Sequence, residues 1–148
     1  MNQSNLTPVD HRILGKMIAL SSCSKLHRIL IAGSKSVELM LELERGGYGH
    51  VAATANCGRP AQQYDVVFVD WRRRTLSALE ATLDWLTDCV SPEGVLVVWA
   101  DPQNPTARDN LRHAIESRRF VVEAASVGED GSAISARRRD VRPIRQAA

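Results

Sequence analysis

The sequence predicts a three-layer α/β domain: a mainly parallel sheet with helices on both faces, closed by an antiparallel hairpin. Short continuous apolar runs, typical of strands buried on both faces, alternate with segments whose apolar residues recur at helical spacing. Strands that alternate with helices favour parallel pairing. Near the C-terminus, two strand-like segments, 120–127 and 132–137, flank the turn residues Gly128-Glu129-Asp130-Gly131, which indicates the hairpin.

The first elements are a helix and a strand. Thr7 suits the N-cap and Pro8 suits the first helical position, and apolar residues then recur at helical spacing, which predicts a helix over about 8–21. The apolar run from His27 to Ala32 predicts a strand buried on both faces.

A second helix and two strands follow. Ser34 or Ser36 can cap this helix, which stops at Gly46-Gly47. The runs HVAATA at 50–55 and DVVFVD at 65–70 predict the second and third strands.

The second half continues the alternation. Ser77 and Glu80 form a capping-box pattern at the head of a helix whose apolar stripe consists of Leu79, Leu83, Leu86 and Val90. Residues 91–94 predict a turn and residues 95–100 a fourth buried strand, after which Thr106 is the expected cap of the last helix.

The composition fits one soluble domain with a sizeable core, because the chain has 148 residues, of which 44% are hydrophobic and 24% charged. We expect this domain to span residues 1–139 and residues 140–148 to form a flexible, Arg-rich tail. No run approaches the ~20 apolar residues of a membrane helix, and the first residues lack the basic and apolar regions of a signal peptide. These features predict a cytoplasmic protein without a membrane partner.

Charge and cysteine content argue against several function classes. The net charge is only +2, so the protein as a whole is not expected to bind nucleic acid. Cys23, Cys57 and Cys89 are an odd number without CxxC spacing, which predicts three buried thiols rather than a disulfide framework, and no metal is expected. No serine lies in a GxSxG pattern, so a hydrolase has no support.

Several segments together resemble the class I S-adenosylmethionine-dependent methyltransferases. RILIAG resembles the first strand and glycine loop of that family, YDVVFVD its fourth strand, and LTDCVSPEGVLVVWA its next helix, turn and fifth strand. LRHAIESRRFVVEAASVGEDGSAISARR resembles its closing helix and hairpin. The resemblance covers about residues 25–139 and implies a Rossmann-like fold, S-adenosylmethionine as cofactor and methyl transfer as activity.

The cofactor loop departs from the family pattern of an acid followed by three glycines at alternate positions. Ile31 stands at the acid, Gly33 at the first glycine, and Lys35 and Val37 at the other two. Val37 brings a β-branched side chain where the cofactor needs open backbone, and Lys35 brings a positive charge near a sulfonium cation. Asn56 stands where the family has an acid that binds the ribose. The sequence therefore predicts weak or lost S-adenosylmethionine binding.

The chain is also shorter than the family pattern by one strand and one helix. The family places both between the strands predicted here at 50–55 and 65–70, where this chain offers only residues 56–64. The link from Asn56 to Tyr64 must then be nearly straight. We expect the helix at about 8–21 to cover the exposed sheet face through Val9, Ile13, Met17 and Ile18. The strand at 50–55, which has no charge or proline, is expected to form a homodimer through its free edge.

The candidate binding site lies at the carboxyl ends of the predicted strands. The loop after the first strand precedes a helix N-terminus, where backbone N–H groups, hydroxyls and an ammonium can hold a phosphate or carboxylate. Asp70 and Trp71 follow a central strand beside the expected switch point of the sheet, where ligands bind in open α/β folds. The predicted cofactor-binding residues are Gly33, Ser34, Lys35, Ser36, Asn56, Asp70 and Trp71, and no catalytic residue is assigned.

The leading hypothesis is a methyltransferase-fold protein that is either a divergent methyltransferase or a binding or regulatory module. One alternative is a receiver-like signalling domain, although Gly33-Ser34 stands where that domain has paired acids. A second alternative is a small nucleic-acid-binding protein that uses the arginine clusters at 72–74 and 137–139. Solvated surface is the simpler interpretation of both clusters, because few aromatic residues accompany them.

Overall fold

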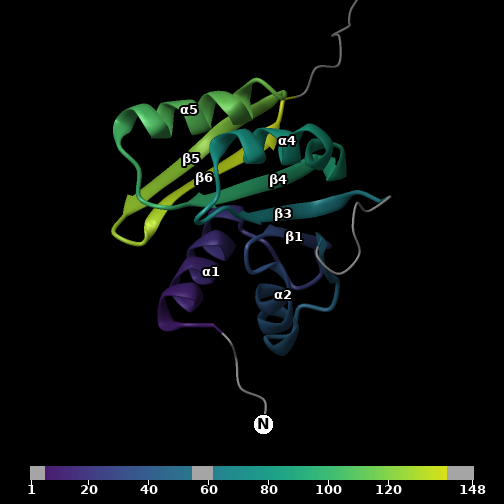
Figure 1. Ribbon diagram of the computed structural model, residues 1–148. Helices are drawn as coiled ribbons and strands as arrows, with labels where there is room; N and C mark the ends of the chain where they lie inside the picture. Colours follow the sequence, from purple (N-terminus) through teal and green to yellow (C-terminus); the bar gives the residue numbers. More distant parts are fainter. Residues whose placement is uncertain (1–5, 55–61, 140–148) are drawn as a thin grey trace, which may run out of the picture.

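The computed structural model describes residues 6–54 and 62–139, in which a six-stranded sheet lies between two layers of helices (Figure 1). The strand order is β2-β1-β3-β4-β6-β5. The first four strands in the chain are parallel, whereas β6 is antiparallel to both β4 and β5. The predicted α/β architecture with a closing hairpin is confirmed. The strands are β1 (Ile29–Gly33), β2 (Val51–Ala53), β3 (Tyr64–Asp70), β4 (Val90–Ala100), β5 (Phe120–Gly128) and β6 (Gly131–Arg138).

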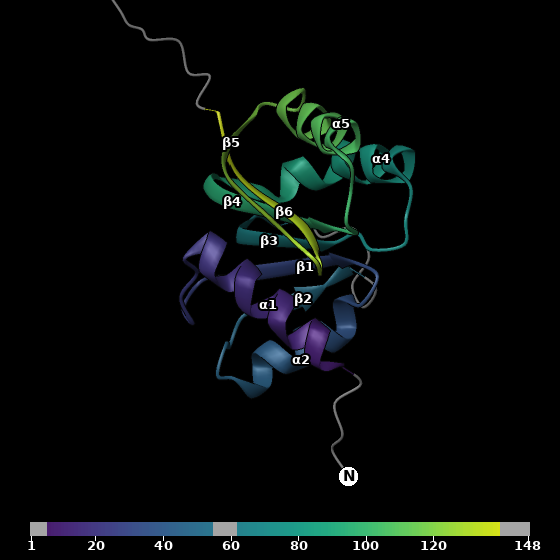
Figure 2. The same ribbon diagram turned by 90° about the vertical axis from the view of Figure 1, so that its left-hand side faces the viewer.

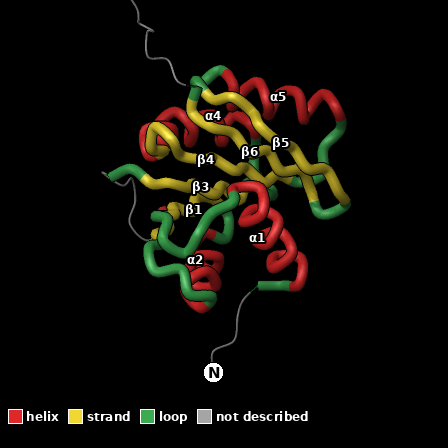
Figure 3. Tube along the Cα trace, turned by 180° about the vertical axis from the view of Figure 1, so that it is seen from behind, coloured by secondary structure: helices red, strands yellow, loops and turns green. Residues whose placement is uncertain are grey.

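The helices divide between the two faces of the sheet. Figure 1 shows α1 (Pro8–Ser21) and α2 (Ser36–Arg45) on one face, and α4 (Leu76–Leu86) and α5 (Pro105–Glu116) on the other. A short 3₁₀ helix, η1 (Thr87–Cys89), joins α4 to β4. The same layers are seen after a 90° turn (Figure 2) and from behind (Figure 3). None of the helices within the described residues is long and apolar enough to cross a membrane.

The alternation of side chains along the strands produces two cores, one on each side of the sheet. On the α4 and α5 side, strand residues such as Leu30, Val67 and Leu96 pack with the helix residues Leu79, Leu83 and Leu86. The opposite core contains Ile31, Phe68 and Trp99 against α1 and α2. The central strands are therefore buried on both faces, as their apolar runs predicted.

The N-terminal helix covers the face on which the sequence predicted it would lie. Ile13 and Met17 are fully buried, and Leu14 joins them although it was not among the expected contacts. Val9 and Ile18 are half-buried at the margin of the same core. α1 contacts β4 and β6, so it shields the middle of the sheet, while α2 lies over β1 and β2.

The caps of α4 and α5 each lie two residues earlier than the sequence predicted. Thr75, two residues before Ser77, caps α4 by accepting a hydrogen bond from the backbone of Ala78. Asn104 rather than Thr106 caps α5, and Pro105 takes the first helical position. In both cases two suitable side chains stand two residues apart, and the earlier one is used.

The start of α2 has no side-chain cap at all. Lys35 is the N-cap residue and forms no capping hydrogen bond, whereas Ser36 is the first helical residue. Ser34 donates its hydroxyl to the carbonyl of Arg72 instead. The loop is therefore held by contacts across the sheet edge rather than by capping.

Strand boundaries also differ from those expected. β2 covers only Val51–Ala53 of the predicted 50–55, and β1 begins at Ile29 rather than at residue 27. The predicted turn at 91–94 lies inside β4, where it interrupts the regular pairing: Tyr64 pairs with Val90, and the next pair is Val66 with Val95. Among the cysteines, Cys89 is buried but Cys23 is only half-buried, and Cys57 lies outside the described residues.

Between β2 and β3, the described residues contain no further strand, in keeping with the shortened pattern. The predicted straight link from Asn56 to Tyr64 lies largely outside the described residues, as does Asn56 itself. β2 occupies one edge of the sheet, as expected for a strand without an outer neighbour.

Candidate functional site

A hollow of about 610 Å³ opens at the carboxyl ends of β1, β3 and β4. It is bounded by the loop after β1, the loop after β3, the start of α1 and the β5–β6 turn. Ligands bind at this end of open α/β sheets because loops diverge there and helix N-termini point inward. The lining residues are Thr7, Val9, Asp10, Ser34, Lys35, Arg72, Arg73, Arg74, Asp101, Glu129 and Asp130.

Gly33 closes β1 in a conformation that favours glycine. Its φ is +106°, and a Cβ added there would overlap the carbonyl oxygen of Asp70. The next residue, Ser34, donates its backbone N–H to that same carbonyl over 2.8 Å. The loop after β1 therefore rests directly on the end of β3, and the single glycine kept from the family pattern is needed for that contact.

Replacing Gly33 with alanine is expected to lower the free energy of unfolding by about 2–5 kcal/mol, from backbone strain and overlap with β3. Gly15→Ala is the matched control, because Gly15 lies on the exposed side of α1 with nothing within 4 Å of an added Cβ. This control should gain about 0.5–1 kcal/mol. Urea denaturation of both variants measures the difference. Equal stability of the two variants would contradict the close approach of the loop to β3.

A chain of four charged groups runs along the floor of the hollow. The Lys35 ammonium donates to one oxygen of Asp10 over 2.7 Å, and Arg72 donates to the other over 2.6 Å. Arg72 also forms two hydrogen bonds of 2.7 Å with the carboxylate of Asp70. Asp70 is fully buried and Asp10 nearly so, whereas the Arg72 side chain is 16% exposed. Two cations and two carboxylates therefore neutralise one another, and we call these four residues the ion chain.

The ion chain shifts the pKa values of Asp10 and Arg72. Burial acts to raise the pKa of Asp10, but hydrogen bonds from Lys35, the Thr7 backbone and Arg72 outweigh it and hold that pKa well below its ordinary value of 3.8. Hydrogen bonds to Asp70 and Asp10 raise the pKa of Arg72 further above its ordinary range. Asp10 and Arg72 therefore stay ionised at neutral pH.

A second group of contacts holds the residues at the rim of the hollow in place. Trp71 is buried and donates its indole N–H to the carbonyl of Thr75 over 2.8 Å. The Arg74 guanidinium lies 5.1 Å from the Trp71 ring and donates to the Ser34 hydroxyl. Arg73 has a φ of +64° and donates its backbone N–H to the Asp101 carboxylate over 2.6 Å. Arg73 and Arg74 thereby place two guanidinium groups at the mouth.

Most of the predicted site residues lie at this edge of the sheet. Gly33, Ser34, Lys35, Asp70 and Trp71 surround or underlie the hollow. Ser36 is buried in the first turn of α2, and Asn56 lies outside the described residues.

Sequence reasoning missed two central members, Asp10 and Arg72. Asp10 also completes a capping box with Thr7 at the start of α1. Arg72 was interpreted as part of a solvated cluster, which is wrong for this residue. Its position two residues after Asp70 was the one available signal.

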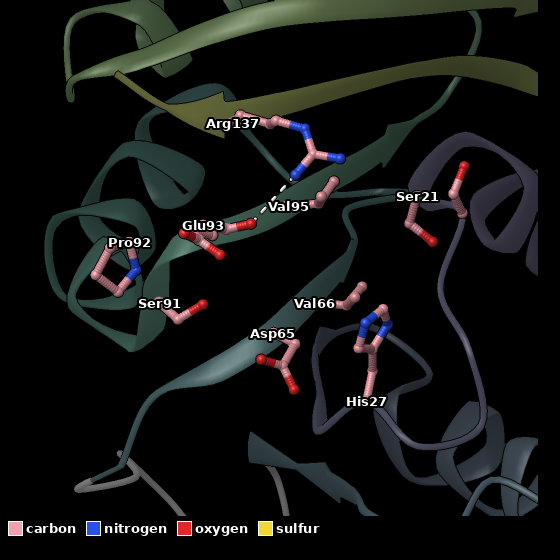
Figure 4. A pocket seen from close by; sticks show the side chains of 10 residues that line it. Ser21, His27, Asp65, Val66, Ser91, Pro92, Glu93, Val95 and Arg137 are labelled. Atoms are coloured by element: carbon pink, nitrogen blue, oxygen red, sulfur yellow. Dashed lines mark hydrogen bonds between the residues drawn. The ribbon is translucent and has the colours of Figure 1, made fainter. Parts of the chain in front are cut away.

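A further hollow of about 480 Å³ lies at the amino ends of the strands (Figure 4). Several of its polar side chains are engaged within the protein. Arg137 binds Glu123 and donates to the Glu93 carbonyl, Asp65 accepts from the Arg28 backbone, and His27 accepts from the Ser24 backbone. The larger hollow at the carboxyl ends is therefore the candidate site.

The sequence matches no protein-family model and no curated protein. Solved structures, by contrast, resemble it closely in backbone. Ribosomal protein L11 methylase from Lactobacillus delbrueckii subsp. bulgaricus superimposes with a TM-score of 0.69 at 11% identity, over 88% of this chain and 79% of that one. The cyclase SpnF gives 0.70 at 11% identity, over 93% and 84%.

A third similar structure is the 1,6-didemethyltoxoflavin-N1-methyltransferase from Burkholderia thailandensis, which contains S-adenosylhomocysteine. It gives a TM-score of 0.68 at 12% identity, over 90% of this chain and 79% of that one. At such identities the likeness concerns the fold alone. The chain has a methyltransferase-like Rossmann fold.

Proposed function

We propose that this protein is a binding or regulatory module on a methyltransferase-like fold, with weak or lost S-adenosylmethionine binding. The observation that carries the proposal is the ion chain of Lys35, Asp10, Arg72 and Asp70. It lies where the resemblance places a glycine-rich cofactor loop, and it joins the loops after β1 and β3 to α1.

The ion chain opposes a sulfonium cofactor in two ways. Lys35 and Arg72 neutralise both carboxylates, so the edge where the sulfonium would lie offers it no net negative charge. Both carboxylates already accept hydrogen bonds from these cations, so a ligand must displace one of the bonds to reach them. Separating a buried ion pair costs about 3–5 kcal/mol, which lowers affinity by roughly a hundredfold or more.

A divergent methyltransferase is the second candidate. The structural neighbour that contains S-adenosylhomocysteine favours it, because the same fold binds the product form of the cofactor in that protein. The two candidate functions predict different affinities for the cofactor, which can be measured directly.

An NMR titration of the full chain with S-adenosylmethionine and with S-adenosylhomocysteine tests the proposal. We expect no saturable shifts at residues 33–37 with either compound in the micromolar range. Saturable shifts there with a micromolar dissociation constant would support the divergent methyltransferase and overturn the loss of binding.

The double variant Lys35→Gly with Val37→Gly should strengthen any residual binding, because it restores the two missing glycines of the family pattern and removes a cation from the ion chain. Lys25→Gly is the control, since Lys25 is exposed and outside the hollow. If the double variant does not bind the cofactor more tightly, the loop after β1 is not what limits cofactor binding.

A further inference from the structure

Strand β5 is an open edge of the sheet. It is nine residues long and pairs on one side only, with β6 (Figure 2). Two of its valines are large exposed apolar side chains: Val121 is 47% exposed and Val127 58%. A long edge strand with exposed apolar residues is a surface on which another strand can pair.

A bulge at Glu123 decides which β5 side chains share a face. Val122 pairs with Ala136 and Ala124 with Ser135, so Glu123 is the extra residue. Ala136 and Ile134 belong to the core under α4 and α5, and cross-strand partners lie on the same face. Val122 and Ala125, the partners of these two residues, therefore face α5, and Phe120 and Val127 do so by alternation.

We propose that two copies of this chain pair antiparallel through β5 and so form one continuous sheet. If the two-fold axis passes between Glu123 and Ala124, residues that face α5 in one copy pair with residues that face α5 in the other. The two faces of the sheet then continue across the interface in spite of the bulge. In this register Val122 lies opposite the partner's Ala125, and Phe120 lies opposite the partner's Val127. Because a two-fold interface uses the same patch twice, each exposed Val127 finds an apolar neighbour.

The charges at the ends of β5 are complementary in the same register. Arg118 and Arg119 precede the strand, and Glu129 and Asp130 follow it. Arg118 is paired with Asp84 and Asp130 with Arg12 inside each chain, so the charges available to the interface are Arg119 and Glu129. Antiparallel pairing brings Arg119 close to the partner's Glu129 at both ends of the interface. Arg119 and Glu129 are exposed and can move toward each other.

The one charge in the middle of β5 does not oppose this pairing. Glu123 is bound by Arg137 of its own chain over 2.9 Å, so the two glutamates near the axis are each neutralised. In contrast, β2 at the other edge offers only three residues. A dimer through the 50–55 segment remains a prediction, and β5 is the longer edge.

Sedimentation equilibrium of the full chain tests the proposal. We expect a dimer whose dissociation constant rises about tenfold or more in Val121→Glu, which places a charge in the interface. Leu41→Glu is the matched control, because Leu41 on α2 is also 47% exposed and lies away from β5. Thermal unfolding checks that both variants are folded.

A charge-reversal pair tests the register itself. Arg119→Glu should weaken the dimer, because residue 119 then repels the partner's Glu129. Arg119→Glu combined with Glu129→Arg should restore the dimer, because opposite charges again meet at each end of the interface. If the chain remains monomeric at high concentration, the proposal is overturned, and the β5 edge is then available to pair with a strand of a different protein. A dimer unaffected by Val121→Glu also overturns it and supports the β2 edge.

Discussion

Removal of residues 1–22 is expected to abolish cooperative unfolding and cause aggregation. The deletion takes away Ile13, Leu14 and Met17, whose side chains are 0–5% exposed in the full chain. Burial of such a side chain stabilises by about 1.5–3 kcal/mol, so the three together approach the ~5–15 kcal/mol total stability of a typical domain. The deletion also uncovers Phe68 and Trp99 on the sheet.

Circular dichroism during urea titration and light scattering measure this outcome. Ile13→Ala is a milder test of the same contact, with an expected loss of about 2–5 kcal/mol. Ala19→Ser, on the exposed side of α1, should change stability by less than about 0.5 kcal/mol. A truncated protein that stays monomeric and unfolds cooperatively would show that α1 is not the necessary cover of this face.

Replacing Arg72 with methionine is expected to lower the free energy of unfolding by about 3–5 kcal/mol at neutral pH, because it leaves two carboxylates with one remaining cation. Methionine keeps most of the arginine volume, so the loss reports charge rather than a cavity. Asp70 loses both of its side-chain hydrogen bonds, and Asp10 keeps only Lys35 and the Thr7 backbone N–H. Arg73→Met, on the exposed neighbouring residue, is the control.

The pH dependence separates a charge effect from a packing effect. In the native chain the pKa of Asp10 is held below its ordinary value of 3.8, so its contribution is fully present above that pH and is lost as the pH falls through the lower native pKa. In Arg72→Met this contribution is reduced, because Asp10 no longer accepts the hydrogen bond from Arg72. The stability difference between the variant and the native chain should therefore persist from neutral pH down to about 3.8 and shrink as the pH falls below that value. A difference that is constant with pH would assign the effect to packing.

Most of the fold could be predicted from the sequence because strand and helix periodicities are local properties. The runs at 65–70 and 95–100 became the buried centre of the sheet, and Leu79, Leu83 and Leu86 form the buried stripe of α4. Boundaries failed where two signals competed within a few residues, as at Thr75 and Ser77. The fold of structural neighbours agrees with the resemblance seen in the sequence.

The site was predictable in position but not in its contacts. Strand ends locate Gly33 and Asp70, because parallel strands present their carboxyl ends at one edge. The bond between Arg72 and Asp10 joins residues 62 positions apart, and no local pattern encodes it. Three consecutive arginines resemble a solvated patch, and only the fold reveals that Arg72 points inward while Arg73 stays exposed.

The placement of β6 between β4 and β5 affects how the sheet can be completed during synthesis. The ribosome makes β5 before β6, yet β5 joins the sheet only through β6. Until residues 131–138 have emerged, β5 has no place in the sheet and β4 has an open side. The last strand made is therefore the one that seals the central edge and attaches its neighbour, so a chain terminated after Gly128 loses two strands from the sheet rather than one.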